Sequence, residues 1–207
     1  MFPHLKDFRA TPQHLEKLRA ALAVYEGTHS FHNYARGVNA DEGRSARYIT
    51  SFNVETPVVF ANGMEWIPTQ VTGQSFLLNQ IRKMVSMAMD VARGAAPLAL
   101  VEEALSKNKD VRVNIAPSQG LFLEMSFYGG YNKHKQINPD LQDLDFADES
   151  TPAYQRWKEF RNGTLMTHVV EEEEREGNFI KYLYIQDSIF NYRKMYQEHI
   201  AELDKEE

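Results

Sequence analysis

The 207-residue chain has a mass of 23.9 kDa and is 43% hydrophobic and 25% charged, proportions typical of a folded globular protein. It contains no cysteine, which excludes thiolate catalysis, disulfide bonds and cysteine-ligated zinc. No apolar run reaches the roughly 18 residues needed to cross a bilayer, so we expect a soluble protein of the cell interior.

The net charge of −6 is unevenly distributed along the chain. Residues 1–135 carry 15 basic and 12 acidic side chains, whereas residues 136–207 carry 8 and 17. A slightly basic domain followed by an acidic segment is compatible with binding to a polyanion, although two ordinary solvated surfaces would give the same counts. We therefore expect a domain at 1–135 and an acidic, mainly helical C-terminal extension at 136–207.

The first half of the chain predicts one helix followed by strands. The helix begins at Thr11-Pro12, with threonine as N-cap and proline in the first turn, and ends at Gly27. Strand-forming residues fill 47–60, and Asn62-Gly63 predicts a hairpin that leads into a returning strand.

Two further helices are predicted at 75–93, ended by Gly94, and at 97–105. Apolar and polar residues alternate over 121–127, which predicts a half-buried strand. This order of elements favours an α+β fold, an antiparallel sheet with helices packed on one face.

The C-terminal extension is predicted to begin with an acidic loop and a helix at 151–160. The glutamate run at 171–174 indicates a surface or disordered segment. A final amphipathic helix is predicted from the helical spacing of Ile185, Ile189, Tyr192, Tyr196 and Ile200.

The helix predicted at 75–93 carries one polar stripe on an otherwise apolar surface. At about 100° per residue, one narrow face collects Ser75, Asn79, Arg82, Ser86 and Arg93. A guanidinium in the middle of a largely buried helix needs an anionic partner to offset its desolvation. For Arg82 that partner is expected to be a carboxylate or a phosphate, and a purely structural ion pair to an acidic residue elsewhere in this domain is one interpretation.

Other chemistry finds little support in the sequence. The three-residue spacing of His29 and His32 is a weak metal signal, and these rings are expected to bond backbone groups. No phosphate-binding loop, dinucleotide-binding glycine pattern or HExxH is present. Asp41-Glu42-Gly43 lies among turn-forming residues and predicts an exposed turn.

Three blocks of the sequence, in the same order and at similar spacing, resemble TruA-type tRNA pseudouridine synthases, in particular the eukaryotic tRNA pseudouridine synthase 1 branch. Residues 73–85 (GQSFLLNQIRKMV) resemble the signature helix of that family. Residues 27–34 (GTHSFHNY), with 47–49 (RYI), are similar to segments near the hairpin, and 116–121 (APSQGL) is similar to the APxxGL element. The resemblance covers residues 11 to about 135.

The resemblance implies an RNA-modifying isomerase with half of a pseudouridine synthase catalytic domain as its fold. The family cleaves the N1–C1′ bond of a uridine, turns the uracil and rejoins it through C5, with no metal and no cofactor. Its substrate is tRNA, whose target uridine must leave the base stack. Residence in the nucleus is usual for this branch, which also has mitochondrial forms.

The catalytic aspartate of the family lies in a G-R-T-D-x-G-V-H-A motif upstream of the matched blocks, and that motif is missing here. Asp41 mimics part of it, but Asn39-Ala40 stands in place of the arginine and threonine, and the distance to Arg82 is too short. The chain thus resembles the C-terminal part of the catalytic domain. We expect it to be inactive alone and to need the missing N-terminal half as a partner.

The resemblance implies roles for particular residues. Arg82 matches the arginine that pairs with the catalytic aspartate across the cleft, and Leu121 matches a leucine near the target base. Substrate contacts are also expected from Ser75 and Asn79. Candidates for phosphate contacts, each of which could equally be a plain surface charge, are Lys83, Arg93, Arg36 and Arg47.

Two other readings remain open. The chain could be a catalytically silent RNA-binding or assembly module that kept the fold. It could also be a protein–protein scaffold built on the acidic segment 136–207. An Arg-Thr-Asp block in the upstream coding sequence would distinguish an enzyme fragment from a silent module.

Overall fold

A computed structural model describes residues 6–134, 140–195 and 201. The chain divides into two compact units, Met1–Pro117 together with Asn178–Glu207, and Ser118–Gly177. The sequence predicted a boundary at residue 135, between a family domain and a C-terminal extension. That boundary differs from the division into compact units, and it stays a prediction. Within the described ranges, no helix combines the length and apolar character that a membrane span requires.

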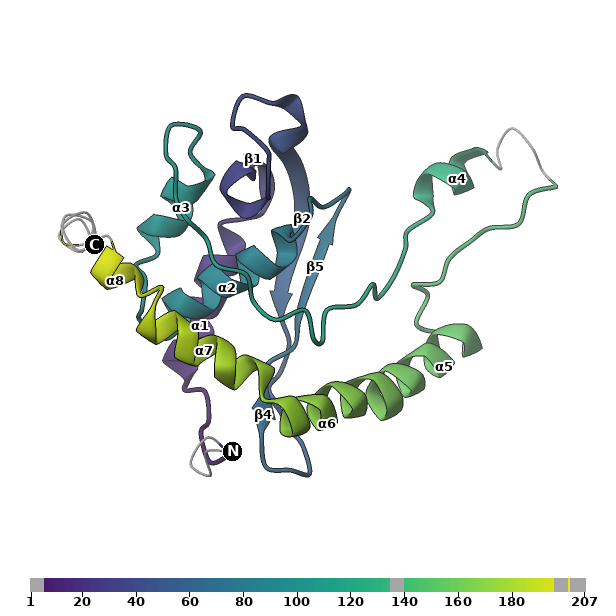
Figure 1. Ribbon diagram of the computed structural model, residues 1–207. Helices are drawn as coiled ribbons and strands as arrows, with labels where there is room; N and C mark the ends of the chain where they lie inside the picture. The colour runs from purple at the N-terminus through teal and green to yellow at the C-terminus, as the bar shows by residue number, and fades with distance from the viewer. Residues whose placement is uncertain (1–5, 135–139, 196–200, 202–207) are drawn as a thin grey trace. The chain divides into compact units, whose positions relative to one another are not determined.

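The first unit contains an antiparallel sheet of three strands in the order β1-β2-β5 (Figure 1). Its strands are β1 (Gly27–Ser30), β2 (Ala46–Val54) and β5 (Thr69–Gly73). A separate hairpin pairs β3 (Val58–Val59) with β4 (Glu65–Trp66). The hairpin predicted at Asn62-Gly63 is confirmed, since Gly63 adopts a φ of 83° between these two strands.

Helices α1 (Pro12–Ala23) and α2 (Gln80–Ala92) lie on the same face of this sheet, as Figure 1 shows. The predicted start of α1 is confirmed. Thr11 Oγ1 accepts from the His14 N–H at 3.2 Å, and His14 Nδ1 accepts from the Thr11 N–H at 3.2 Å. Helix α3 (Ala99–Leu105) follows α2, and short 3₁₀ turns occupy His32–Tyr34 and Gly43–Ser45. The fold is α+β, as expected.

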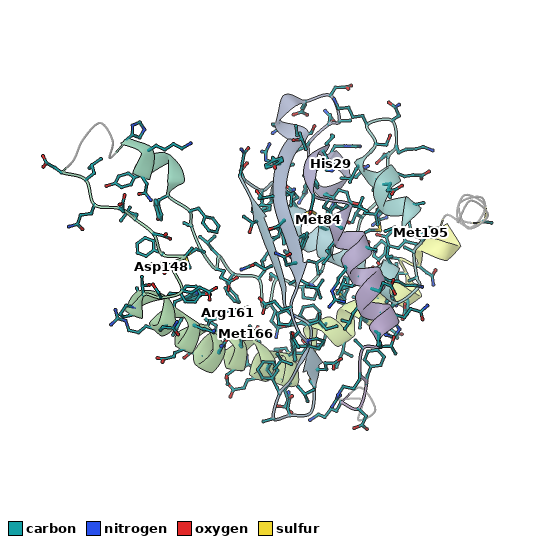
Figure 2. The ribbon with its side chains drawn as sticks, turned by 180° about the vertical axis from the view of Figure 1, so that it is seen from behind. His29, Met84, Asp148, Arg161, Met166 and Met195 are labelled. Carbon is teal, nitrogen blue, oxygen red and sulfur yellow. The ribbon has the colours of Figure 1, made fainter. Side chains whose placement is uncertain are left out.

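The core of this unit lies between the sheet and the helices. Its fully buried aromatic residues include Tyr25, Phe31 and Tyr34, and the Tyr25 and Tyr34 rings meet edge to face at 5.2 Å. Met84 of α2 is also fully buried here, between α2 and the strands (Figure 2). Burial of each large side chain contributes about 1.5–3 kcal/mol to folding, which anchors one face of α2.

Two predicted helix boundaries are wrong. Helix α1 ends at Ala23, and Gly27 opens β1 with a φ of 95°. Helix α2 begins at Gln80, not at Ser75, because Asn79 has a left-handed backbone with a φ of 66°. A left-handed residue interrupts a right-handed helix, so residues 74–79 form a loop that leads into α2.

The second unit holds α4 (Gly129–His134), α5 (Pro152–Phe160), a π-helical turn (Arg161–Leu165) and α6 (Met166–Glu176). The start of α5 is as predicted, with Thr151 Oγ1 accepting from the Tyr154 N–H at 3.2 Å. The glutamate run at 171–174 is helical and lies within α6, so the surface-or-disorder prediction is wrong for Glu173, which is 1% exposed.

The strand predicted at 121–127 is also wrong. These residues form no strand, and Leu123 and Phe127 are exposed. A strand requires a hydrogen-bonded neighbour, and the described residues provide none for this segment. Instead, the Phe122 ring packs against Trp157. Glu124 forms an ion pair with Arg161, which is labelled in Figure 2, at 3.2 Å.

The C-terminal segment returns to the first unit as α7 (Asn178–Ser188) and α8 (Tyr192–Met195). The predicted apolar face is wrong for Ile185 and Ile189, which are exposed while Gln186 is buried, and it is confirmed for Tyr192, which is buried. The reason lies in α2, which presents polar side chains to α7 and so requires polar partners. The predicted positions Tyr196 and Ile200 lie outside the described residues.

Candidate active-site wall on helix α2

Arg82 lies in the first turn of α2 and is half-buried. Its Nε donates to the carbonyl oxygen of Ala116 at 2.7 Å, and its Nη1 donates to Asn79 Oδ1 at 3.2 Å. In return, the Ala116 N–H donates to the Arg82 carbonyl at 3.3 Å. The guanidinium is therefore oriented by two oxygen acceptors on opposite sides, one from the loop before α2 and one from the segment after α3.

No carboxylate in the described part of the chain forms an ion pair with Arg82, and its Nη2 has no hydrogen-bond partner there. Arg93, eleven residues further on and directly after the last residue of α2, has two carboxylate partners: Asp90 at 2.8 Å and Asp187 at 2.5 Å. The purely structural ion pair considered for Arg82 is thus found at Arg93. Arg82, in contrast, bonds only uncharged oxygen atoms within the described residues.

The sequence predicted that Asn79 and Arg82 lie on one polar stripe, and their side chains are hydrogen-bonded to each other. Ser75, predicted on the same stripe, lies before the helix begins. Ser75 lies exposed in the loop 74–79. The loop is shaped by Gln80, whose Oε1 accepts from the Leu77 N–H at 2.8 Å. Gln80 is fully buried, and its Nε2 has no hydrogen-bond partner among the described residues. The proposed substrate contacts of Ser75 and Asn79 stay predictions.

Two of the expected phosphate-binding cations are engaged inside the fold. Lys83 Nζ donates to the carbonyl oxygen of Asn33 at 2.8 Å, and burial lowers the pKa of this amine. The charge of Arg93 is balanced by its two aspartates. An RNA phosphate would have to replace these contacts, which costs free energy. The phosphate contacts of Lys83 and Arg93 stay predictions.

The other two expected cations lie near the loop between β1 and β2. Arg36 is exposed, and no ion pair engages it within the described ranges. Arg47 is half-buried; its Nη1 donates to the carbonyl oxygens of Arg44 and Ala46, both at 2.7 Å. Its Nε is buried and lacks a hydrogen-bond partner among the described residues. Of the two guanidinium groups, that of Arg36 is therefore the more accessible to a phosphate.

Leu121 belongs to the second unit and is 47% exposed. It follows Gly120, which has a φ of 81°, and its N–H donates to the Ser118 carbonyl at 3.0 Å. The APSQGL block thus forms a turn that ends in an exposed leucine. Its placement near a target base stays a prediction.

The weaker candidates of the sequence lie as expected. His29 Nε2 is 2.7 Å from the Glu26 carbonyl oxygen, and His32 Nε2 is 3.1 Å from that of Lys109. Asp41 is exposed in a turn in which Glu42 Oε1 accepts from the Asn39 N–H at 3.0 Å. Among the residues with described positions, no three histidine or acidic side chains are grouped to hold a metal.

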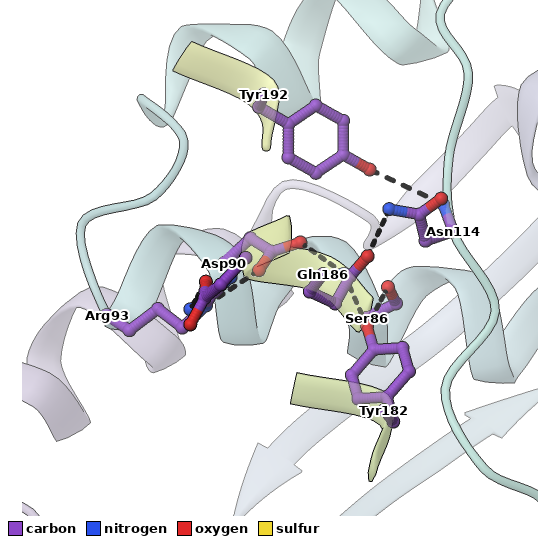
Figure 3. A network of polar contacts seen from close by, with 8 residues as sticks. Ser86, Asp90, Arg93, Asn114, Tyr182, Gln186 and Tyr192 are labelled. Carbon is purple, nitrogen blue, oxygen red and sulfur yellow. Dashed lines mark hydrogen bonds and ion pairs between the residues drawn. The ribbon is translucent and has the colours of Figure 1, made fainter. Parts of the chain in front are cut away.

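A buried polar network joins α2 to α7 and was not predicted from the sequence (Figure 3). Ser86 Oγ lies 2.5 Å from Tyr182 Oη, and Gln186 Nε2 donates to Asp90 Oδ2 at 2.9 Å and to Tyr182 Oη at 2.7 Å. Asn114 Nδ2 donates to Gln186 Oε1. The signal that could have found it is the spacing of Ser86, Asp90 and Arg93, which share the polar face of α2.

Burial raises the pKa of Asp90 to about 6, and the hydrogen bond and charge of Arg93 oppose that shift. Burial also raises the pKa of the Tyr182 hydroxyl to about 12, so this group stays a neutral donor at physiological pH. Asp90 is therefore the buried carboxylate of this network whose protonation changes near neutral pH.

Residues 21–129 match the model of a family described as "tRNA pseudouridine synthase". The chain is similar to "tRNA pseudouridine synthase 1" of Schizosaccharomyces pombe, with 34% identity over 184 residues, which cover 89% of this chain and 33% of the relative. It is also similar to the proteins of the same name from Yarrowia lipolytica (40% identity; 64% of this chain, 25% of the relative) and Saccharomyces cerevisiae (37%; 63% and 24%). The chain thus spans a quarter to a third of the length of these relatives.

Proposed function

Since the chain belongs to the tRNA pseudouridine synthase family, we propose that it forms the C-terminal wall of an active-site cleft in which uridine of tRNA is isomerised to pseudouridine. The catalytic aspartate would come from an N-terminal half that lies outside this sequence. The relatives are three to four times as long as the stretch matched here, which leaves room for such a half.

The observation that carries this proposal is the state of Arg82. It is held in one orientation by Asn79 and Ala116, yet no carboxylate in the described ranges pairs with it. A half-buried guanidinium is costly without an anion, and its Nη2 offers a donor to a carboxylate that arrives from another part of the enzyme. In that pair the guanidinium would keep the carboxylate ionised and in one rotamer.

Asp41 is an unsuitable nucleophile within the chain. It lies exposed in a turn among Asn39, Glu42 and Arg44, without the arginine and threonine of the family motif. For this reason we propose that the chain alone forms no pseudouridine. We also propose nuclear residence, with mitochondrial forms, on the family resemblance.

The test is pseudouridine formation on tRNA by the full-length enzyme, by its Arg82→Ala and Arg82→Lys variants, and by residues 1–207 alone. We expect Arg82→Ala to lose 10²-fold or more in rate, roughly the loss seen when a preorganised charge is removed from an active site. Lysine should not restore the rate, because it cannot form a bidentate pair. Arg44→Ala is the matched control, since Arg44 already pairs with Glu42 on the surface.

Two results would contradict the proposal: a wild-type rate for Arg82→Ala, or turnover by residues 1–207 alone. A third result, tight binding of tRNA by the full-length protein without any pseudouridine formed, would instead identify a silent RNA-binding module.

A further inference from the structure

The C-terminal helices and the segment that holds Arg82 are physically connected. Segment 111–116 runs across α2 (Figure 1), and three of its own residues, Val111, Val113 and Ala116, are buried. Its last residue, Ala116, accepts from Arg82 Nε at 2.7 Å and donates to the Arg82 carbonyl at 3.3 Å. The position of Arg82 therefore depends on where this segment lies.

Two residues of the C-terminal helices hold the same segment through Asn114. The Asn114 side chain donates from Nδ2 to Gln186 Oε1 in α7, and the Asn114 N–H donates to Tyr192 Oη in α8 at 3.4 Å. Figure 3 shows both contacts converging on Asn114 from the two helices. Asn114 is two residues from Ala116, so α7 and α8 act close to the atoms that orient the guanidinium.

Gln186 is the centre of this connection. It is 1% exposed, and its amide bonds Asn114 on one side and Asp90 and Tyr182 on the other. Removal of that amide would leave Asp90 Oδ2 and Asn114 Nδ2 short of partners in a buried site, which costs about 1–3 kcal/mol for each polar group left unpaired. A buried network whose polar groups are satisfied in this way rigidifies the part of the core that it occupies.

We infer that α7 and α8 position Arg82, through Gln186, Tyr192 and Asn114, and that the C-terminal segment is thus part of the active-site wall. This inference rests on the proposed function. Asn114 and Gln186 are positioning residues: among the described residues neither is hydrogen-bonded to the Arg82 side chain, and each would act through the main chain of Ala116. A catalytic arginine displaced by about 1 Å can cost up to 10²-fold in rate, so the effect should be measurable.

The experiment uses the full-length enzyme with Asn114→Ala, Gln186→Ala and Gln186→Met, the last of which keeps the side-chain length and avoids a cavity. Asn132→Ala is the matched control, since Asn132 makes two hydrogen bonds with the Leu144 main chain in the second unit. Single-turnover rate, tRNA affinity and hydrogen exchange of residues 112–118 and 46–54 are measured for each. Asn114→Ala is also combined with Arg82→Lys.

We expect the Asn114 and Gln186 variants to lose about 10-fold or more in single-turnover rate with unchanged tRNA affinity. Exchange should rise at 112–118 and not in β2, and Asn132→Ala should behave as wild type. In the Arg82→Lys background, Asn114→Ala should add no further loss, because two residues that act through one contact are not additive.

Wild-type rates in Asn114→Ala and Gln186→Met, or a fully additive loss in the double variant, would overturn the inference. Arg82→Ala measured in parallel separates the two failures. If Arg82→Ala is active, the proposed function itself fails. If Arg82→Ala is inactive while the Asn114 and Gln186 variants are unimpaired, only the positioning role is lost.

Discussion

Arg82 lies in the first turn of α2 and Arg93 directly after its last residue, yet Arg93 has two carboxylate partners and Arg82 has none in the described part of the chain. At about 100° per residue, eleven residues amount to about 20° beyond three full turns, so the two positions lie on nearly the same side of the helix axis, at its opposite ends. The C-terminal half of this face is covered by α7, and the N-terminal half is held by uncharged oxygen atoms. Arg93 is therefore held in structural ion pairs, whereas Arg82 can pair with a carboxylate from another part of the enzyme.

Asn79 should serve both the loop and the guanidinium. Its φ of 66° suits glycine, and its Oδ1 accepts from Arg82. We expect Asn79→Gly to leave the free energy of unfolding within about 0.5 kcal/mol of wild type and Asn79→Ala to lower it by about 1 kcal/mol. Both should slow pseudouridine formation by the full-length enzyme, because both remove the acceptor for Nη1. Urea unfolding and single-turnover assays measure the two effects, and an Asn79→Ala protein as stable as wild type would refute the strain argument.

Arg36 should contribute to RNA affinity through phosphate and not through base recognition. Its side chain is exposed, whereas the charge of exposed Arg44 is offset by Glu42. We expect Arg36→Ala to weaken tRNA binding and to reduce the slope of log affinity against log salt by about 1, with a smaller change for Arg44→Ala. Equilibrium binding between about 50 and 200 mM salt provides the comparison. Equal slopes for wild type and Arg36→Ala would remove Arg36 from the RNA-contacting surface.

Gly73 should be needed for close packing at the end of β5. A Cβ at this position would lie 2.9 Å from the Tyr48 carbonyl oxygen and 3.2 Å from Ile49 Cδ1. Because a main-chain atom is among the obstacles, we expect Gly73→Ala to lower the free energy of unfolding by about 1–3 kcal/mol. Gly43→Ala is the control, since a Cβ there meets nothing within 4 Å. Thermal and urea unfolding of the two variants test this, and equal stability would show that the sheet adjusts.

Asp90 should make stability depend on pH. Its pKa of about 6 in the folded protein lies above the ordinary value of 3.8, so the folded state binds more protons than the unfolded state between these limits. The contribution of Asp90 to the free energy of unfolding is therefore largest below pH 3.8 and falls as the pH rises through 6. We expect the difference in stability between wild type and Asp90→Asn to change across this window and to be constant above about pH 7. A difference independent of pH from 4 to 7 would contradict the raised pKa.

Sequence reasoning recovered the elements whose signals are local. The caps at Thr11 and Thr151, the turn at Asn62-Gly63 and the end of α2 at Gly94 each depend on a few neighbouring residues, and all are present. The sequence-based predictions failed for elements whose structure depends on what packs beside them. Alternation at 121–127 predicts a strand only if another strand lies beside it, and the isoleucines at 185 and 189 predict a buried face only if the opposing surface is apolar.

What the sequence alone determined is the family and the α+β arrangement of the elements, because periodicity and motif spacing are properties of consecutive residues. What only the tertiary structure decided is which polar groups meet. Asn114, Ala116 and Gln186 come from distant parts of the chain, and their hydrogen bonds exist only once α7, α2 and segment 111–116 are packed together. Hydrogen bonds act over about 3 Å, so no spacing along the chain could have revealed that the C-terminal helices reach the support of Arg82.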